Sequence, residues 1–286
     1  MIRYTHHMEQ LAGHTAVITG GASGIGLAMA HRFGAEGMKL MLADIEVGPL
    51  AGAVEALRAD GYEVESFEFD VRELDQVRAL EAAARERFGN IHLLCNNAGV
   101  GAGGQVAGLD DIERWRWTID INLWGVIYGC KTFLPGMIAQ GEPAHIVNTA
   151  SMAGHLANAF MGAYNVSKYG VVALSETLSR EMQVAGNSVG VSVLCPAFVQ
   201  TGIADSARNL PAELHVEPTE EGEAMKQIMD ALVAGGMETH VVADAVCDAV
   251  INNNFWILTH DDSKPAIMSR ADDIISNVNP VPYMGG

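Results

Sequence analysis

The chain is poor in cysteine and in basic residues, and it contains no long apolar run. Its 286 residues include only four cysteines, at positions 95, 130, 195 and 247. This wide spacing fits neither a disulfide framework nor a zinc-binding pattern, and it favours a reducing, cytoplasmic compartment. No uninterrupted apolar segment approaches the length that spans a membrane. Because the formal net charge is −18, the sequence argues against nucleic acid or an anionic membrane surface as a partner.

The N-terminal residues also lack the apolar segment of a secretory signal peptide, since Met1–Gln10 is polar. His6 and His7 precede a second methionine, so we interpret residues 1–7 as a cloning remnant or an over-extended start, with the native start near Met8. Neither an internal repeat nor a low-complexity linker interrupts the rest. Residues 8–286 are therefore expected to form one domain, which is long enough to bury a large core.

Short apolar runs alternate with longer helix-like stretches throughout the chain. This alternation predicts a doubly wound, Rossmann-type α/β fold, with a parallel sheet of seven strands and helices on both faces. The expected strands are Thr15–Gly20, Lys39–Asp44, Glu63–Asp70, Ile91–Asn97, His145–Ser151, Gly190–Pro196 and Phe255–Thr259. The expected helices begin near Gly24, Val47, Leu74, Asp110, Gly162 and Val242, and the largest runs from Asp110 to Gln140. Ligands bind such sheets beyond the carboxyl ends of the strands, where the strand order reverses.

A glycine-rich turn, Thr19–Gly26, follows the first strand and leads into a helix. Its glycines permit a tight turn and a close approach of the backbone to a pyrophosphate at the positive helix N-terminus. Alone, such a motif is often only a turn. The residues of this turn that we expect to bind a dinucleotide are Gly20, Ser23, Gly24, Ile25 and Gly26.

Asp44 ends the second strand, where an acid is expected to hold the adenosine ribose hydroxyls. It could instead be an ordinary turn residue. A 2′-phosphate at ~4 Å from that carboxylate would cost roughly 4 kcal/mol per charge pair at an effective dielectric of ~20. No compensating cation occupies the nearby positions 22, 23 and 45, so the predicted cofactor is NAD. Further residues expected to contact the cofactor are Ile45, Asp70 with Val71, and the small-residue segment Asn97, Ala98 and Gly99.

Tyr164 and Lys168 lie four residues apart, thirteen positions after Ser151. On a helix this spacing places the ammonium beside the phenol. A free phenol has a pKa near ~10, and a nearby cation favours the phenolate and makes the group a usable acid or base near neutrality. An exposed Tyr/Lys pair on a helix surface is the alternative. The glycine turn upstream favours the catalytic interpretation.

Together these residues resemble the short-chain dehydrogenase/reductase family, over roughly Leu11 to Thr259. The matching features are Thr19–Gly26, Asp70, Asn96–Gly99, Asn122, Ser151, Tyr164 and Lys168, followed by Pro196, Val199 and Thr201. One departure is Ala197, where the family usually has glycine.

The resemblance implies a catalytic tetrad of Asn122, Ser151, Tyr164 and Lys168. Tyr164 would exchange the alcohol proton, Ser151 would stabilise the same oxygen, and Lys168 would lower the pKa of Tyr164 and bind the nicotinamide ribose. Asn122 would hold a water connecting Lys168 to solvent. The carboxamide would be held after the sixth strand, at Pro196, Val199 and Thr201. Without the Tyr/Lys pair, Ser151 would be interpreted as a turn residue at the end of a strand, and Asn122 would be interpreted as a polar residue in the middle of a helix.

Residues 198–236 have the composition of a cover over the substrate. The expected walls are mostly small or apolar and contain no arginine clamp for a carboxylate or phosphate: Val100–Gly104, Met152–Phe160, Phe198 and Ile203. The predicted substrate is a neutral, hydrophobic secondary alcohol or its ketone. Arg208, in the cover, is interpreted as structural. His155, near Ser151, is interpreted as a loop histidine without a role. No metal site is expected.

The C-terminal extension, 260–286, adds a weaker likeness to bacterial dehydrogenases of aryl-ether and bulky benzylic alcohols. In the family, the two long helices, Asp110–Gln140 and Gly162–Gly186, pair between subunits, so a homotetramer or dimer is expected. Two alternatives are a 3-oxoacyl carrier-protein type reductase and a non-catalytic dinucleotide sensor. The first normally prefers the phosphorylated cofactor and needs a basic patch, which Asp44 and the charge of −18 oppose. The second has no need of Ser, Tyr and Lys together.

Overall fold

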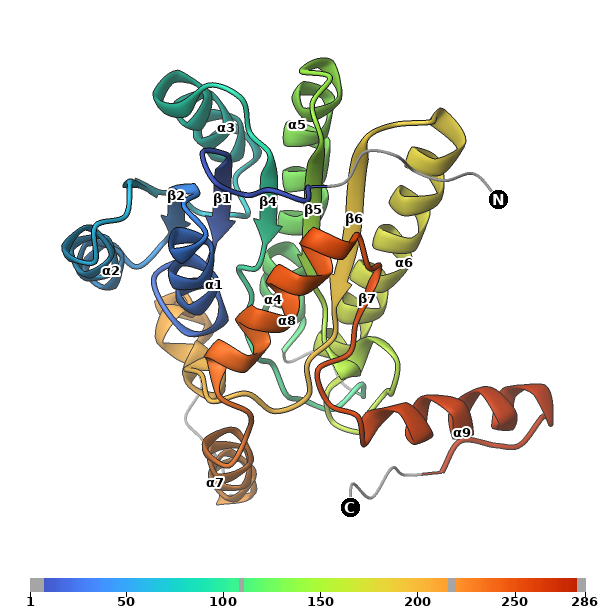
Figure 1. Cartoon of the computed structure of the whole chain (residues 1–286). Helices are drawn as coiled ribbons and strands as arrows, with labels where there is room; N and C mark the ends of the chain where they lie inside the picture. The colour runs from blue at the N-terminus through green and yellow to red at the C-terminus, as the bar shows by residue number, and fades with distance from the viewer. Residues whose placement is uncertain (1–7, 108–110, 216–219, 282–286) are drawn as a thin grey trace.

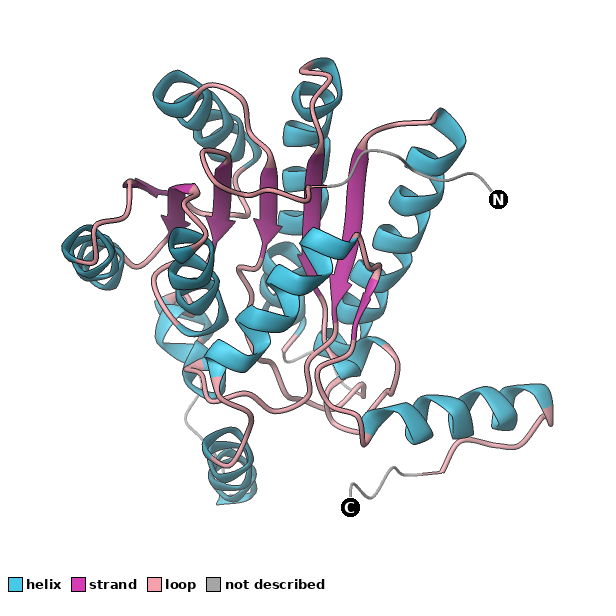
Figure 2. Ribbon diagram, viewed as in Figure 1, coloured by secondary structure: helices cyan, strands magenta, loops and turns pink. Residues whose placement is uncertain are grey.

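Seven parallel strands form one sheet in the computed structural model of the chain, which describes residues 8–107, 111–215 and 220–281. The sheet order is β3-β2-β1-β4-β5-β6-β7, and helices cover both faces (Figures 1 and 2). The strands are β1 Thr15–Thr19, β2 Lys39–Asp44, β3 Val64–Glu68, β4 Leu93–Asn96, β5 Ala144–Thr149, β6 Val189–Leu194 and β7 Trp256–Ile257. The predicted Rossmann-type fold is confirmed. Only β2 ends where expected, because the other strands leave the sheet earlier.

The α-helices of the described residues are α1 Gly24–Ala35, α2 Val47–Ala59, α3 Leu74–Phe88, α4 Ile112–Ile119, α5 Gly125–Ala139, α6 Gly162–Ala185, α7 Glu220–Ala234, α8 Thr239–Asn252 and α9 Ser263–Ile275. Helices α1, α2, α3 and α6 begin where the sequence predicts. Helix α8 begins earlier than Val242, at Thr239. The expected start at Asp110 lies outside the described residues. Two helices were not predicted: α7 within the cover and α9 in the C-terminal extension.

Two hydrophobic layers hold the helices against the sheet. Helices α1, α2 and α8 pack on one face, with Phe33, Leu57 and Val246 fully buried among them. Helices α3, α5 and α6 pack on the other face. Because both faces are covered, the strands read as continuous apolar runs and not as alternating ones, and β1, β4 and β5 are buried along their whole length.

Helix α5 approaches β4 so closely that only a glycine fits between them. A Cβ built at Gly129 would lie 2.0 Å from Oδ1 of Asn96. Asn96 donates to the side-chain oxygen of Asn148 on the neighbouring strand at 2.9 Å, and Asn148 donates to Ser175 on α6 at 3.0 Å. This buried polar chain satisfies its own hydrogen bonds and fixes α5 and α6 to the centre of the sheet.

The predicted long helix is continuous from Ile112 to Ala139, but it is not a uniform α-helix. A π-helical turn, η1 Asp120–Trp124, separates α4 from α5. Such turns widen the helix locally and are often found at functional sites. This turn, which carries Asn122, was not predicted from the sequence.

The C-terminal extension projects from the body of the molecule. Figure 1 shows α9 extending away from the sheet, next to the carboxyl ends of β6 and β7. None of its residues is buried, and Met268, Ile274 and Ile275 expose most of their side chains.

Candidate active site

The reversal of strand order places a ligand-binding groove beyond the carboxyl ends of β1 and β4. From β1 the chain proceeds to β2 and β3 on one side, and from β4 it proceeds to β5, β6 and β7 on the other. Connections leaving in opposite directions open a crevice at this point. The glycine turn, Asn97 and Ser151 all follow strands that end there, as the sequence predicts.

The glycine turn requires glycine at specific positions. Gly20 and Gly24 have φ angles of +65° and +54°, which other residues rarely adopt. A Cβ at Gly20 would lie 2.9 Å from the Cα of Ala98, and one at Gly26 would lie 2.0 Å from the carbonyl oxygen of Gly20. Ser23 is the N-cap of α1 and makes no side-chain capping bond. The first-turn N–H groups of a helix have no intrahelical partner, so this end of α1, which includes Ile25, can receive an anion.

Asp44 is a buried carboxylate at the end of β2. It is 8% exposed, and its two oxygens accept from the backbone N–H groups of Ala22 and Glu46, each at 3.0 Å. These bonds fix the carboxylate next to the glycine turn, which is where an acid for ribose hydroxyls is expected. The following residue, Ile45, is 46% exposed.

The residues expected at the adenine have their own partners. Asp70 accepts from the Arg72 side chain at 2.6 to 3.0 Å and from the Arg72 backbone at 2.9 Å. Val71 packs against α5, because a Cβ at Gly125 would lie 2.5 Å from its side chain. The Asp70 carboxylate is therefore already paired, and sequence reasoning did not identify Arg72.

A chain of hydrogen bonds joins the glycine turn to Lys168. The hydroxyl of Thr19 accepts from the N–H groups of Asn97 and Ala98 at 2.9 and 3.0 Å. The Asn97 amide donates to the carbonyl of Thr19 at 3.2 Å and accepts from the hydroxyl of Thr149 at 3.3 Å. Lys168 then donates to the carbonyl of Thr149 at 3.1 Å. Thr149 was missed from the sequence, although a buried hydroxyl two residues before Ser151 was a visible signal.

The helix α6 brings Tyr164 and Lys168 to one face, as their spacing predicts. Both are buried, with exposed fractions of 8% and 3%, and the ammonium lies 5.6 Å from the phenol ring centroid. The hydroxyl of Ser151 accepts from the N–H of Ala153 at 3.1 Å and donates to the carbonyl of Pro196 at 3.3 Å. The tyrosine, lysine and serine of the predicted tetrad are thus gathered at the ends of β5 and β6.

The pKa values at this site differ from the expectation. Burial raises the pKa of Tyr164, and a hydrogen bond with Ser151 only partly opposes this increase. Burial also lowers the pKa of Lys168 to about 8, while proximity to Cys195 opposes the decrease. Lys168 was expected to lower the pKa of Tyr164. In the protein alone the dominant influence on both groups is instead loss of solvent, which disfavours every charged form.

Asn122 is completely buried in the π-helical turn. Its side chain accepts from the N–H of Val100 at 2.8 Å and donates to the carbonyl of Val100 at 2.9 Å. It also donates to Ser167 at 3.3 Å, next to Lys168. The observed contacts of this side chain fix the loop after β4, where Gly99 lies. A bond to water, as the sequence reasoning expected, remains a prediction.

The segment after β6 is held by the C-terminal extension. The carbonyl of Pro196 accepts from the N–H of Met152, and the N–H of Ala197 donates to Nδ1 of His260 at 3.3 Å. The other ring nitrogen of His260 lies 3.2 Å from the carbonyl of Phe198. Val199 pairs with Met237 in an isolated bridge. The contribution of His260 was not predicted, because the sequence places it far from Ala197.

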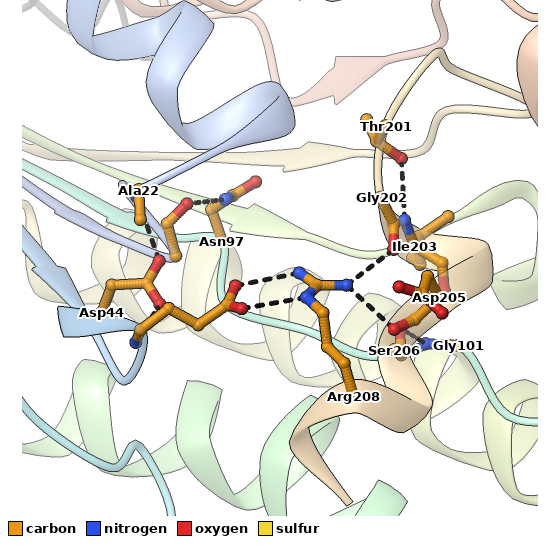
Figure 3. A network of polar contacts seen from close by, with 12 residues as sticks. Ala22, Asp44, Asn97, Gly101, Thr201, Gly202, Ile203, Asp205, Ser206 and Arg208 are labelled. Atoms are coloured by element: carbon orange, nitrogen blue, oxygen red, sulfur yellow. Dashed lines mark hydrogen bonds and ion pairs between the residues drawn. The ribbon is translucent and has the colours of Figure 1, made fainter. Parts of the chain in front are cut away.

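Beyond Val199, the cover crosses the groove. The hydroxyl of Thr201 lies 3.4 Å from the N–H of Ile203, where the short helix η3 Ile203–Asn209 begins. Ser206 in η3 accepts from the N–H of Gly101 at 2.9 Å, and Arg208 forms an ion pair with Glu46 at 2.9 Å. Figure 3 shows η3 connecting the loop after β4 with the residues after β2.

The substrate side of the groove is mostly apolar, with two charged residues that the sequence reasoning omitted. Val100, Trp117 and Leu210 form a small buried cluster between the loop after β4, α4 and the cover. A neighbouring pocket is lined by Gly101–Gly103, Ala163, Asp111 and Arg114, among others. Arg114, which α4 contributes, lies outside the walls named from the sequence, and the absence of an arginine clamp for an anionic substrate stays a prediction.

His155 packs beside β7. Its ring centroid lies 5.4 Å from that of Trp256, and its carbonyl accepts from the hydroxyl of Tyr169 at 2.5 Å. Burial lowers the pKa of His155, and the nearby Arg270 lowers it further. These contacts connect the loop after β5 with α6 and β7, so His155 has packing contacts that its interpretation as a loop histidine without a role did not include.

The residues around the groove suit a dinucleotide. The free helix N-terminus at Ser23 can hold a pyrophosphate, and the fixed carboxylate of Asp44 can accept from ribose hydroxyls. Within residues 8–107, 111–215 and 220–281, no group of three His, Cys, Asp or Glu side chains could hold a metal ion. Over the same residues, no helix is long and apolar enough to span a membrane.

Comparison with known proteins shows the same relationship along the chain. The family model described as short chain dehydrogenase matches residues 14–211. A short chain dehydrogenase/reductase from Burkholderia phymatum, solved in complex with NAD, is 44% identical, with a TM-score of 0.92 over 97% of this chain and 99% of that one.

Two curated relatives match over most of their length. The CLA biosynthesis dehydrogenase/reductase of Lactiplantibacillus plantarum is 32% identical over 96% of this chain and 97% of the relative. The C alpha-dehydrogenase of Sphingobium sp. is 31% identical over 96% of this chain and 89% of the relative, which confirms the weaker likeness to that branch. The chain is therefore an oxidoreductase that belongs to the short-chain dehydrogenase/reductase family.

Proposed function

We propose that this protein is an NAD-dependent alcohol dehydrogenase that interconverts a hydrophobic secondary alcohol and its ketone. The observation that carries the proposal is the placement of Tyr164, Lys168 and Ser151 in one buried cluster, joined by hydrogen bonds through Thr149 and Asn97 to the glycine turn. A protein that only senses a dinucleotide has no need of this cluster.

Each residue of the cluster has a distinct role in the proposed reaction. NAD, when bound, supplies the hydride acceptor. Tyr164 accepts the alcohol proton in oxidation and returns it to the ketone in reduction. Ser151 donates a hydrogen bond to the same substrate oxygen and stabilises its developing charge. Lys168, held by the Thr149 carbonyl, stabilises the phenolate and binds ribose, while Asn122 positions the backbone after β4.

The preference for NAD rests on Asp44. Its carboxylate is fixed by two backbone N–H groups, so it cannot easily turn away from a 2′-phosphate. Members of this family use NAD or NADP, and the Burkholderia phymatum relative was crystallised with NAD. We infer that the ribose hydroxyls of NAD replace water at Asp44. The other cofactor contacts that we propose are the glycine turn, Asp70 with Val71, Asn97–Gly99, and Pro196, Val199 and Thr201.

An aromatic or alicyclic substrate fits the apolar walls. Trp117 and Leu210 line the pocket beside the loop after β4, and with Val100 they form a buried apolar cluster behind it. The relationship to the C alpha-dehydrogenase of Sphingobium sp. supports a bulky secondary alcohol. Arg114, at the edge of the pocket, is exposed to solvent and does not by itself require an anionic substrate.

A panel assay tests the proposal. The protein is incubated with NAD and a set of benzylic, alicyclic and short aliphatic secondary alcohols, and absorbance of the reduced nicotinamide is followed. We expect turnover of the bulky alcohols, reduced by more than about 100-fold in Tyr164→Phe, which removes the acid/base but keeps the ring. Calorimetry should show NAD binding retained in that variant. Binding of NAD without turnover of any alcohol or ketone would refute the enzymatic role.

We also propose a homotetramer or dimer and a reducing compartment. Trp124 in η1 and Val166 on α6 remain about half exposed although they are apolar, on the two long helices that pair between subunits in the family. All four cysteines are free and buried, which is compatible with the cytoplasm. Light scattering of the intact protein, compared with a Val166→Lys variant, measures the proposed assembly.

A further inference from the structure

Arg208, an arginine of the cover, forms an ion pair with Glu46 beyond the end of β2. Nε and Nη2 donate to the two carboxylate oxygens of Glu46, each at 2.9 Å. Nη1 donates to the carbonyls of Gly202 and Asp205, each at 3.0 Å. Figure 3 shows the guanidinium pointing from η3 toward the residues after β2. Four of the five N–H donors of Arg208 are therefore bonded, and Glu46 holds the Nε–Nη2 edge of the guanidinium.

Glu46 lies two residues after Asp44 and is connected to it directly. The N–H of Glu46 donates to Asp44 at 3.0 Å, so the same short segment presents two carboxylates. The hydrogen bond with Glu46 raises the pKa of Arg208 most, and attraction to Asp44 adds to it. The guanidinium is therefore close to Asp44, the acid that we assign to the adenosine ribose, although Arg208 follows Asp44 by 164 residues in the sequence.

An arginine in this place is the group that normally accepts the 2′-phosphate of NADP. Guanidinium binds phosphate through paired, charge-assisted hydrogen bonds, and an arginine near the ribose acid accommodates that phosphate in dinucleotide-binding folds. Here Glu46 occupies both of the nitrogens that could form such a pair. We propose that Glu46 sets the cofactor choice by sequestering Arg208, so that the cover arginine cannot receive the 2′-phosphate.

This inference rests on the proposed use of NAD and adds a second determinant to Asp44. Asp44 repels the 2′-phosphate directly, whereas Glu46 withholds the cation that would offset the repulsion. The effects of Asp44 and Glu46 on NADP binding can therefore be measured separately. Loss of Glu46 should improve NADP binding only while Arg208 is present, because the gain comes from the released guanidinium and not from the lost negative charge.

Equilibrium binding of NAD and NADP, measured by calorimetry, tests the proposal without any turnover. The proteins are the wild type, Glu46→Gln, Arg208→Gln, the double variant, and Glu55→Gln as a control that removes the same charge from an exposed position on α2. We expect Glu46→Gln to lower the Kd for NADP by about tenfold, the effect of one hydrogen bond to a charged group. The Kd for NAD should stay within about twofold, because its ribose has no phosphate for Arg208 to bind.

The double variant decides between the two origins of the gain. If it binds NADP as weakly as Arg208→Gln does, the released guanidinium is responsible and the proposal holds. An equal gain in the double variant or in Glu55→Gln, or no gain in Glu46→Gln, overturns it. Thermal unfolding checks that each protein is folded, and Glu46→Ser replaces Glu46→Gln if the amide variant is not. A wild type that binds both cofactors equally would refute the proposed preference for NAD. The role of the Glu46–Arg208 ion pair is tested separately, by the change in NADP affinity between the variants.

Discussion

The two halves of the site are held in different ways. The adenosine half, beyond β1 and β2, is built from the backbone of a glycine turn and from one carboxylate fixed by N–H groups of neighbouring residues. The catalytic half, beyond β5 and β6, depends on long-range contacts, such as the bond from Lys168 to Thr149 and the contacts of His260 with Ala197 and Phe198. Changes in the first half should alter which cofactor binds, and changes in the second should alter chemistry.

The largest expected effect is that of Lys168→Ala. Lys168 serves both halves, since it stabilises the phenolate of Tyr164 and binds the nicotinamide ribose in the proposed reaction. We expect turnover to fall by more than about 100-fold and NAD affinity to fall as well, as measured by steady-state kinetics and calorimetry. Lys131→Ala, at an exposed position on α5, is the matched control and should change neither. Unchanged NAD affinity in Lys168→Ala would restrict the role of this lysine to the catalytic half.

The pH dependence of Tyr164 should differ between the free protein and its NAD complex. Burial raises the pKa of Tyr164 in the protein alone, so its phenolate should form only above the ordinary value of ~10. The positive charge of bound NAD favours the phenolate, and the shift on binding is therefore downward. Because the Lys168 ammonium lies 5.6 Å from the ring centroid of Tyr164, we expect the two groups to titrate as a coupled pair, with observed values that belong to both.

Difference absorbance titration of the wild type against Tyr164→Phe, with and without NAD, measures this shift. We expect the pKa of Tyr164 to decrease when NAD binds, and a decrease of about one unit would raise the fraction of phenolate about tenfold. Oxidation should accordingly become faster as the pH rises through the lower value, and ketone reduction should be favoured below it. An identical titration with and without NAD, or a hydride step that is independent of pH while showing a deuterium isotope effect, would contradict the role of Tyr164 as the base.

The residues that sequence reasoning identified share one property: their function depends on local geometry. Gly20, Gly24 and Gly26 are required by backbone angles and close approach within one turn, and Tyr164 and Lys168 by the spacing of a helix. Such constraints are visible in a short stretch of sequence. The same holds for β2 and for the starts of α1, α2, α3 and α6.

The contacts that were missed depend on where distant segments meet. Arg208 reaches Glu46 only because η3 crosses the groove, and His260 reaches Ala197 only because β7 lies next to β6. The π-helical turn at Asn122 is a small change of hydrogen-bonding register that apolar periodicity does not record. Burial raises the pKa of Tyr164 in the protein alone, and helix spacing shows a nearby cation but not the degree of burial. The lowered pKa expected with NAD bound stays a prediction.

An intermediate effect is expected for Asp44→Ala, which tests the adenosine half. The wild type should prefer NAD over NADP by at least about tenfold in kcat/KM, because the fixed carboxylate opposes the extra phosphate. Removing it should narrow this preference, mainly through weaker use of NAD, since the ribose hydroxyls lose their acceptor. Glu68→Ala, an exposed acid at the end of β3, controls for the change in net charge. Equal kinetics with both cofactors in the wild type would contradict the assignment of Asp44.

The smallest expected effect is that of His260→Ala, which tests how the catalytic half is held. A neutral imidazole has one acceptor and one donor nitrogen, so Nδ1 can accept from the N–H of Ala197 while Nε2 donates to the carbonyl of Phe198. Both contacts brace the segment that leads to Val199 and Thr201. Their loss should destabilise the fold by about 1 kcal/mol per hydrogen bond and loosen the wall beside the nicotinamide.

We therefore expect a KM for the alcohol that rises a few-fold in His260→Ala, with the Kd for NADP relative to NAD unchanged. His260→Gln should recover part of the loss, because an amide also offers one acceptor and two donors. If His260→Ala instead alters the choice between NAD and NADP, the two halves of the site are coupled through the cover, and the separation drawn between them is wrong.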